Sequence, residues 1–269
     1  MRDGVAKINP LAALDCALRC EYLAVSFDWM RLPGRCSECG PAHGALSALG
    51  VHSDGEREVL GVWLASETDS LAWRSASTDL EIRGVERLRF AISREAASAA
   101  NRPSPAPQRS IELPHLERSI AAILAQVEPR YRGAMTDAFR AVLVASRARA
   151  VDAAMTAVEA GPLGEGYAPL VVQWRALVSR WAPVFALPVA QRRLVLAVDR
   201  LAADSHKGLF RAIARHGPFT DSAAALGFIA SALQRAERRL DRKRAVCVAS
   251  VGLRARRVNM DGRLAVAGG

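Results

Sequence analysis

The sequence predicts an α/β protein in which a mixed β-sheet precedes a large helical region. Residues 45–93 contain apolar runs of strand length around an Asp-Gly pair, followed by a helical segment and a further apolar run. From residue 111 to about 244, apolar residues recur almost entirely at helical spacing. Three prolines within residues 101–110 mark the break between the two patterns.

The N-terminal half supplies the strands in order. Residues 11–24 have a helix-like composition and lead into an apolar run that we expect to be a strand ending near Asp28. Residues 45–65 predict two strands joined by a hairpin, with Asp54-Gly55 as the turn. Residues 66–84 predict a helix that Ser66 or Thr68 caps and Gly84 ends, and residues 85–93 predict the next strand.

Composition indicates a folded protein with an anionic partner. Of the 269 residues, 51% are apolar, which is enough to bury a core. Lys and Arg total 37 against 27 Asp and Glu, and the formal charge of +10 favours nucleic acid as a partner, the alternative being an Arg-rich composition without such a role. Charged residues interrupt every apolar stretch, including the N-terminal one, so we expect a cytoplasmic protein without a membrane span or signal peptide.

Four of the five cysteines precede residue 40. Cys36 and Cys39 have knuckle-like spacing in a glycine-flanked loop, and Cys16, Cys20 and His43 are near enough in sequence to complete a zinc site. Unpaired thiols are the alternative, and we favour them because Cys16 and Cys20 fall on the predicted helix.

Residues 50–93, "GVHSDGEREVLGVWLASETDSLAWRSASTDLEIRGVERLRFAIS", resemble the catalytic core of the Mutator family of DDE transposases. The likeness rests on "REVLG", the following Trp and the "RGV" turn, and it continues downstream. "ELPHLERS" (112–119) is similar to the family's Cys-x-x-His-x-x-Arg segment, with Glu112 in place of the cysteine. "WRALVSRWAPVFALPVAQRR" (174–193) and "KGLFRAIARHGPF" (207–219) resemble two further family segments, so the likeness spans residues 22 to 240.

The resemblance implies a ribonuclease-H-like mixed sheet with a large helical insertion and a helical C-terminus. On this basis residues 22–100 form the core sheet, 101–190 the helical insertion and 191–245 the helices that complete the catalytic core. Residues 246–269 are expected to be a disordered tail. Family members extend further at the N-terminus with a helical domain that recognises element ends, so residues 1–21 look like a remnant helix of a truncated chain.

The resemblance also implies metal-dependent DNA cleavage and strand transfer at the ends of an insertion sequence. The family holds two Mg²⁺ ions with three carboxylates, and paired cations stabilise the attacking and leaving oxygens of phosphoryl transfer. The first family carboxylate falls on Asp28, which is therefore the expected catalytic residue and metal ligand. The second falls on Arg94, and the third falls on Ala202 or Ala203.

The nearest substitutes for the two missing carboxylates are Glu95 and Asp204, which complete the candidate catalytic set. A shift of one residue turns a strand side chain to the opposite face and rotates a helical one by about 100°. Arg94 also carries a guanidinium that cannot be neutralised and that repels a metal ion. We therefore expect impaired catalysis.

Several basic positions are expected to contact DNA. His115 and Arg118 share a helix face, although a half-buried structural histidine is an equal alternative for His115. A basic run around the third catalytic position is expected to follow DNA phosphates: Arg192, Arg193, Lys207 and Arg211. Trp174 and Trp181 are seven residues apart on one side of a helix, and we expect them to pack in a core rather than to stack on bases.

The main hypothesis is thus a degenerate transposase that acts on DNA. The alternatives are a non-catalytic DNA-binding regulator that poisons full-length transposase subunits, and a pseudogene product. A homo-oligomer is a further possible assembly.

Overall fold

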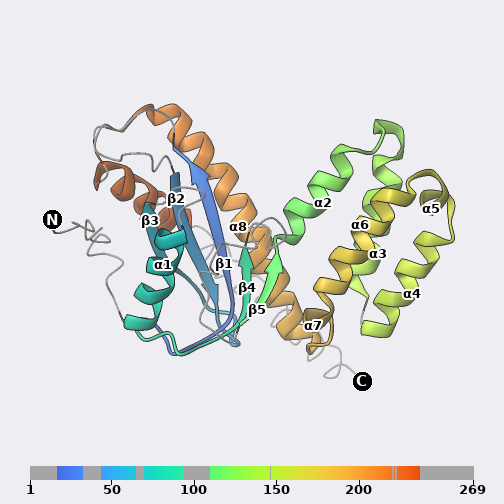
Figure 1. The fold of residues 1–269 in the computed structure, drawn as a ribbon, viewed down its shortest axis with the longest axis horizontal. Coiled ribbons are helices and arrows are strands. Elements are labelled where there is room, and N and C mark those ends of the chain that lie inside the picture. Colours follow the sequence, from blue (N-terminus) through green and yellow to red (C-terminus); the bar gives the residue numbers. More distant parts are fainter. Residues whose placement is uncertain are drawn as a thin grey trace, which may run out of the picture.

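This computed structural model describes residues 17–32, 44–64, 70–93, 110–145, 147–219, 221 and 223–236. They form a five-stranded mixed sheet in the order β3-β2-β1-β4-β5, with helices on both faces and a helical body beside it (Figure 1). The strands are β1 (Glu21–Arg31), β2 (Gly44–Val51), β3 (Arg57–Leu64), β4 (Arg87–Ser93) and β5 (Ile111–Pro114). β2 and β3 run antiparallel along one side of β1, and β4 and β5 run parallel on the other. The predicted mixed α/β class is confirmed.

The predicted hairpin between β2 and β3 is confirmed. Its turn closes where the His52 amide donates to the Glu56 carbonyl over 2.9 Å. Gly55 has φ +90°, a backbone conformation that is unfavourable for residues with a Cβ atom. The Asp-Gly pair in the sequence therefore predicts the turn correctly.

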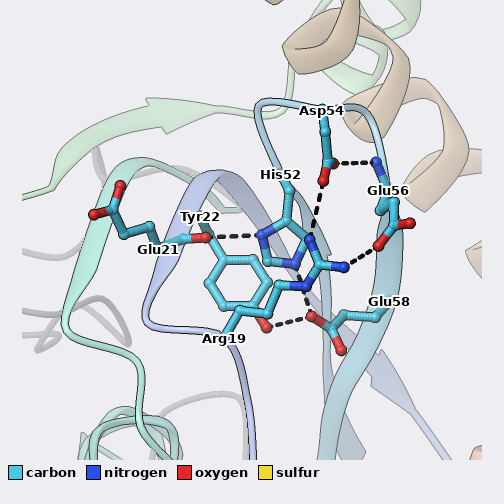
Figure 2. Close-up of polar contacts among 7 residues, drawn as sticks. All are labelled: Arg19, Glu21, Tyr22, His52, Asp54, Glu56 and Glu58. Carbon is cyan, nitrogen blue, oxygen red and sulfur yellow. Dashed lines mark hydrogen bonds and ion pairs between the residues drawn. The ribbon is translucent and has the colours of Figure 1, made fainter.

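A polar cluster joins this turn to the start of β1 (Figure 2). The buried His52 ring lies against Tyr22, with ring centroids 4.2 Å apart, and Nδ1 donates to the Glu21 carbonyl over 2.8 Å. One oxygen of Glu58 accepts from the Tyr22 hydroxyl at 2.5 Å, and His52 Nε2 lies 2.8 Å from the same oxygen. Two ion pairs reinforce the connection: Arg19–Asp54 and Arg19–Glu56. The hairpin is thereby fixed against the central strand.

Two helices cover opposite faces of the sheet (Figure 1). α1 (Ser70–Ile82) ends before Gly84, which has φ +109°, and its Leu80 packs in one cluster with Phe27 of β1. α8 (Val189–His216) crosses the other face, where Leu209 packs with Met30. Because successive strand residues point to opposite faces, β1 contributes to both layers and is buried on each side.

The helical body follows β5. Its elements are α2 (Leu116–Ala125), the short 3-10 helix η2 (Pro129–Tyr131), α3 (Arg132–Val144), α4 (Ala148–Glu159), α5 (Pro162–Gly166), α6 (Ala168–Arg180) and α7 (Ala182–Phe185). The fully buried Trp174 packs on Phe139 with ring centroids 4.0 Å apart. Trp181, also fully buried, donates from its indole N–H to the Pro114 carbonyl over 3.1 Å. The predicted core role of both tryptophans is confirmed.

Two local predictions are wrong. The expected strand from Tyr22 is present as part of β1, but the helix expected before it is not: residues 17–20 are not helical, and residues 11–16 lie outside the described part. Residues 111–114 form β5 rather than the start of the helical region. In both places the neighbouring strand decides the outcome, because β4 pairs with β1 and with β5 and supplies their hydrogen bonds.

Candidate functional site

The candidate site begins with a buried acid on the central strand. Ser26, Asp28 and Met30 alternate along β1 and line a cavity on the α8 side, whereas Phe27 and Trp29 pack on the α1 side. Asp28 is only 5% exposed. A carboxylate at this depth is costly unless charges or hydrogen bonds compensate for the lost water.

Two basic side chains provide that compensation. The guanidinium of Arg118, on α2, forms a charged hydrogen bond with Asp28 Oδ2. His206 Nδ1, on α8, lies 2.9 Å from the same oxygen. Burial raises the pKa of Asp28, but the contact and charge of His206, and then the charges of Arg118 and His115, lower it more, so the net pKa lies below the ordinary value. Asp28 is therefore ionised at neutral pH.

The other oxygen of this carboxylate, Oδ1, is buried and has no hydrogen-bond partner among the described residues. Ser26 Oγ, on the same strand and facing the same cavity, is also buried and without such a partner there. Buried polar atoms are usually satisfied, so exceptions need a reason. These two atoms mark the polar end of the cavity.

A second buried pair supports the first. His115 Nε2 donates to the Phe27 carbonyl over 3.0 Å, and Nδ1 lies 3.0 Å from Asp199 Oδ1. Asp199 Oδ2 accepts the backbone N–H of Glu117 over 3.0 Å. His115 and Asp199 are 3% and 1% exposed. The pair joins β1, the start of α2 and α8, so it fixes the segment that carries Arg118.

The cavity has a volume of about 220 Å³ and lies between β1, β2, β3 and α8. Its polar lining consists of Ser26, Asp28, Ser47, Arg57, Ser205 and His206. Apolar side chains supply the rest, including Leu233 from the helical segment 223–236. Ala202 is among the lining residues and Ala203 is not, although both are buried. Of the two positions that the resemblance offers for the third carboxylate, Ala202 is the one beside Asp28.

The predicted substitute acids lie elsewhere or outside the described residues. Asp204 is on the solvent side of α8, where its carboxylate is 65% exposed and lies 4.0 Å from Lys207 Nζ. It does not line the cavity that contains Asp28. Arg94 and Glu95 lie outside the described residues.

The predicted basic residues separate into two groups. Arg193, Lys207 and Arg211 are exposed on α8. Arg192 is 3% exposed, and His115 and Arg118 belong to the buried and half-buried pairs described above. The first group is open to solvent, whereas the second group is engaged within the fold.

Sequence reasoning missed Asp199 and His206. A usable signal was present: Asp199, Ala202 and His206 follow each other at spacings of three and four, so they share one helix face. The same face carries Val195 and Leu209, which are buried in the core. Polar residues on an otherwise apolar stripe are candidates for buried pairing.

The described residues do not fit a divalent-metal centre. Within them, no group of three or more His, Cys, Asp or Glu side chains is arranged to hold a metal ion. Mg²⁺ needs several oxygen ligands, whereas here one carboxylate faces protein cations. Of the cysteines and histidine considered for zinc, Cys20 is exposed and free, and Cys16, Cys36, Cys39 and His43 lie outside the described part.

No helix within the described ranges is long and apolar enough to cross a membrane.

Comparison with known proteins gives a consistent result. The family model described as "Transposase, Mutator family" matches residues 15–238. A "Transposase for insertion sequence element ISRM3" from Rhizobium meliloti (strain 1021) is 28% identical over 213 residues, covering 76% of this chain and 51% of that protein. A "Probable transposase for insertion sequence element" from Corynebacterium diphtheriae is 30% identical over 185 residues, covering 66% of this chain and 52% of that protein. This chain therefore spans about half the length of the curated relatives it matches.

Proposed function

Because this chain belongs to the Mutator family of transposases, we propose that it acts on the DNA of an insertion sequence with impaired cleavage and strand transfer. The family reaction would be metal-dependent phosphoryl transfer at element ends. The observation that carries the proposal is Asp28, a buried and ionised carboxylate on the central strand at the position of the first family carboxylate. The relatives' names as insertion-sequence transposases support the same class of function.

The proposed fold is ribonuclease-H-like. A mixed sheet whose central strand carries the buried acid, with the long helix α8 packed across it, supports this assignment. We place the core sheet in residues 22–100 extended by β5, the helical insertion after it up to residue 190, and the completing helices in 191–245.

Impairment follows from the charges at Asp28. Mg²⁺, when bound in the family, would stabilise the oxygens that gain charge during phosphoryl transfer. In this chain Arg94 and Ala202 stand at the other two expected ligand positions, and Arg118 and His206 contact the remaining carboxylate. The described residues therefore do not supply the oxygen ligands that this chemistry requires.

DNA contact is proposed for the exposed basic face of α8. Arg193, Lys207 and Arg211 project from this helix, and the whole chain carries a formal charge of +10. Each cation that neutralises a phosphate releases counterions, which gives salt-sensitive affinity without sequence preference. The buried Arg192 is better suited to a structural role than to a phosphate contact.

A second candidate is a non-catalytic DNA-binding regulator. The pairing of Asp28 with protein cations favours it, because DNA binding through α8 does not require a metal site. Such a protein could bind element DNA or join full-length transposase subunits. A pseudogene product remains the third alternative.

The test is nicking of supercoiled DNA in Mg²⁺ or Mn²⁺, alongside DNA binding over a salt series. We expect salt-dependent binding and little cleavage. Cleavage by the natural chain that is lost in Asp28→Ala would show a working active site and refute impairment. Absence of both binding and cleavage would refute the proposed action on DNA and favour the pseudogene alternative.

A further inference from the structure

The two basic side chains at Asp28 are held in place by the fold. Arg118 lies in the first turns of α2, and Asp199 anchors the start of this helix through the backbone N–H of Glu117 and through His115. His206 lies in the interior of α8, and its side chain is 25% exposed. The Arg118 side chain is similarly enclosed, at 26% exposed. Neither side chain moves freely at the surface.

The surroundings of the carboxylate add positive charge rather than negative. Among the described residues that line the cavity, Asp28 is the single acid, and Arg57 and His206 are basic. Arg118 contacts the same carboxylate from α2. A divalent ion entering from the cavity would therefore meet the positive charges of Arg57 and Arg118 at short range, where water screens charge poorly.

We propose that Arg118, with His206 as a second neighbour, is a built-in counterion of Asp28 that takes the place of a divalent cation at this carboxylate. A metal ion binds there tightly only after Arg118 is removed. The inference rests on the proposed function only in treating Asp28 as the position of a family metal ligand.

The test adds a second carboxylate and then removes the counterion. Ala202→Glu places an acid in the cavity beside Asp28, and the cavity volume of about 220 Å³ has room for the side chain. Arg118→Leu is then combined with Ala202→Glu. Arg200→Leu in the same background is the matched control, because it removes an exposed α8 cation. Mn²⁺ binding to the full chain without DNA is measured by electron paramagnetic resonance.

We expect the natural chain and Ala202→Glu to bind Mn²⁺ weakly, and the Arg118→Leu combination to bind more than about tenfold more tightly. Asp28→Asn should abolish that gain, and the Arg200→Leu control should show none. Equal affinity in the Ala202→Glu single variant and the Arg118→Leu combination would overturn the proposal. So would an equal gain from Arg200→Leu, which would indicate net charge alone.

A second measurement is made on the natural chain, and variants serve only to assign its signals. The guanidinium protons of Arg118 are observed by nuclear magnetic resonance, and their signals are assigned by their loss in Arg118→Leu or their shift in Asp28→Asn. These protons should exchange slowly with solvent, and their signals should not shift in about 10-fold molar excess of Mg²⁺. Displacement of these signals by Mg²⁺ would overturn the proposal. Neither measurement involves DNA, so its failure is distinct from failure of the proposed function.

Discussion

Replacing Asp199 with Ala tests the buried pair that fixes the candidate site. Both oxygens of Asp199 are used, one facing His115 Nδ1 at 3.0 Å and the other accepting the Glu117 N–H at 3.0 Å. The side chain is 1% exposed, so water cannot replace these contacts without rearrangement. The variant leaves a buried histidine and a backbone N–H without their acceptor.

The expected cost is about 1–3 kcal/mol for each buried polar group that loses its partner. Two groups lose theirs, the His115 ring and the Glu117 N–H, so the total should exceed the cost of a single lost hydrogen bond. Asp204→Ala is the matched control, because it makes the same substitution on the same helix at a side chain that is 65% exposed. Its effect should stay within about 0.5 kcal/mol.

The assay is urea unfolding followed by circular dichroism, with the free energy of unfolding extrapolated to water. Asp199→Asn provides a milder change that keeps the shape and one acceptor oxygen, and its cost should fall between those of the two Ala variants. If Asp199→Ala cost no more than Asp204→Ala, the pair would contribute nothing to stability. The pair would then not be what fixes Arg118 at Asp28.

Three further predictions concern other parts of the molecule. Glu58→Ala should lower the free energy of unfolding by about 1–3 kcal/mol, because the Tyr22 hydroxyl and His52 Nε2 lose their shared partner; thermal or urea unfolding measures this. Asp28→Asn should lower the free energy of unfolding most near neutral pH. Its difference in unfolding free energy from the natural chain should narrow as the pH falls below about 3.9, which urea unfolding over a pH series measures. Arg211→Gln should weaken binding to any DNA sequence and reduce the slope of log affinity against log salt by about 1, measured by fluorescence anisotropy.

The sign of the pH prediction follows from the lowered pKa of Asp28. An acid with a lower pKa in the folded state stabilises the fold above its ordinary pKa and loses that contribution as it becomes protonated. A difference in unfolding free energy between Asp28→Asn and the natural chain that widened towards low pH would contradict this.

Glu56→Ala, at a side chain that is 63% exposed, is the control for Glu58→Ala and should have little effect on stability. An unchanged salt slope in the Arg211 variant would remove α8 from the DNA contact.

Local patterns predicted most of the sheet and both helical layers. The Asp54-Gly55 turn could be identified because a hairpin of this kind needs a residue that tolerates positive φ, and glycine does so without steric cost. The end of α1 before Gly84 followed from the same property. Strand β5 could not be identified in this way, since "IELP" is short and ends in proline; it exists because Leu113 pairs with Ile92 of β4.

The sequence by itself determined the family, the mixed α/β class and the placing of Asp28 on a strand, because each depends on local patterns and on motifs that follow one another along the chain. Only the tertiary structure decided what surrounds that acid. Arg118 is 90 residues away in sequence, and His206 comes from a different helix. Burial makes the charge of Asp28 costly without partners, and the fold, by packing α2 and α8 against β1, determines which cations supply them.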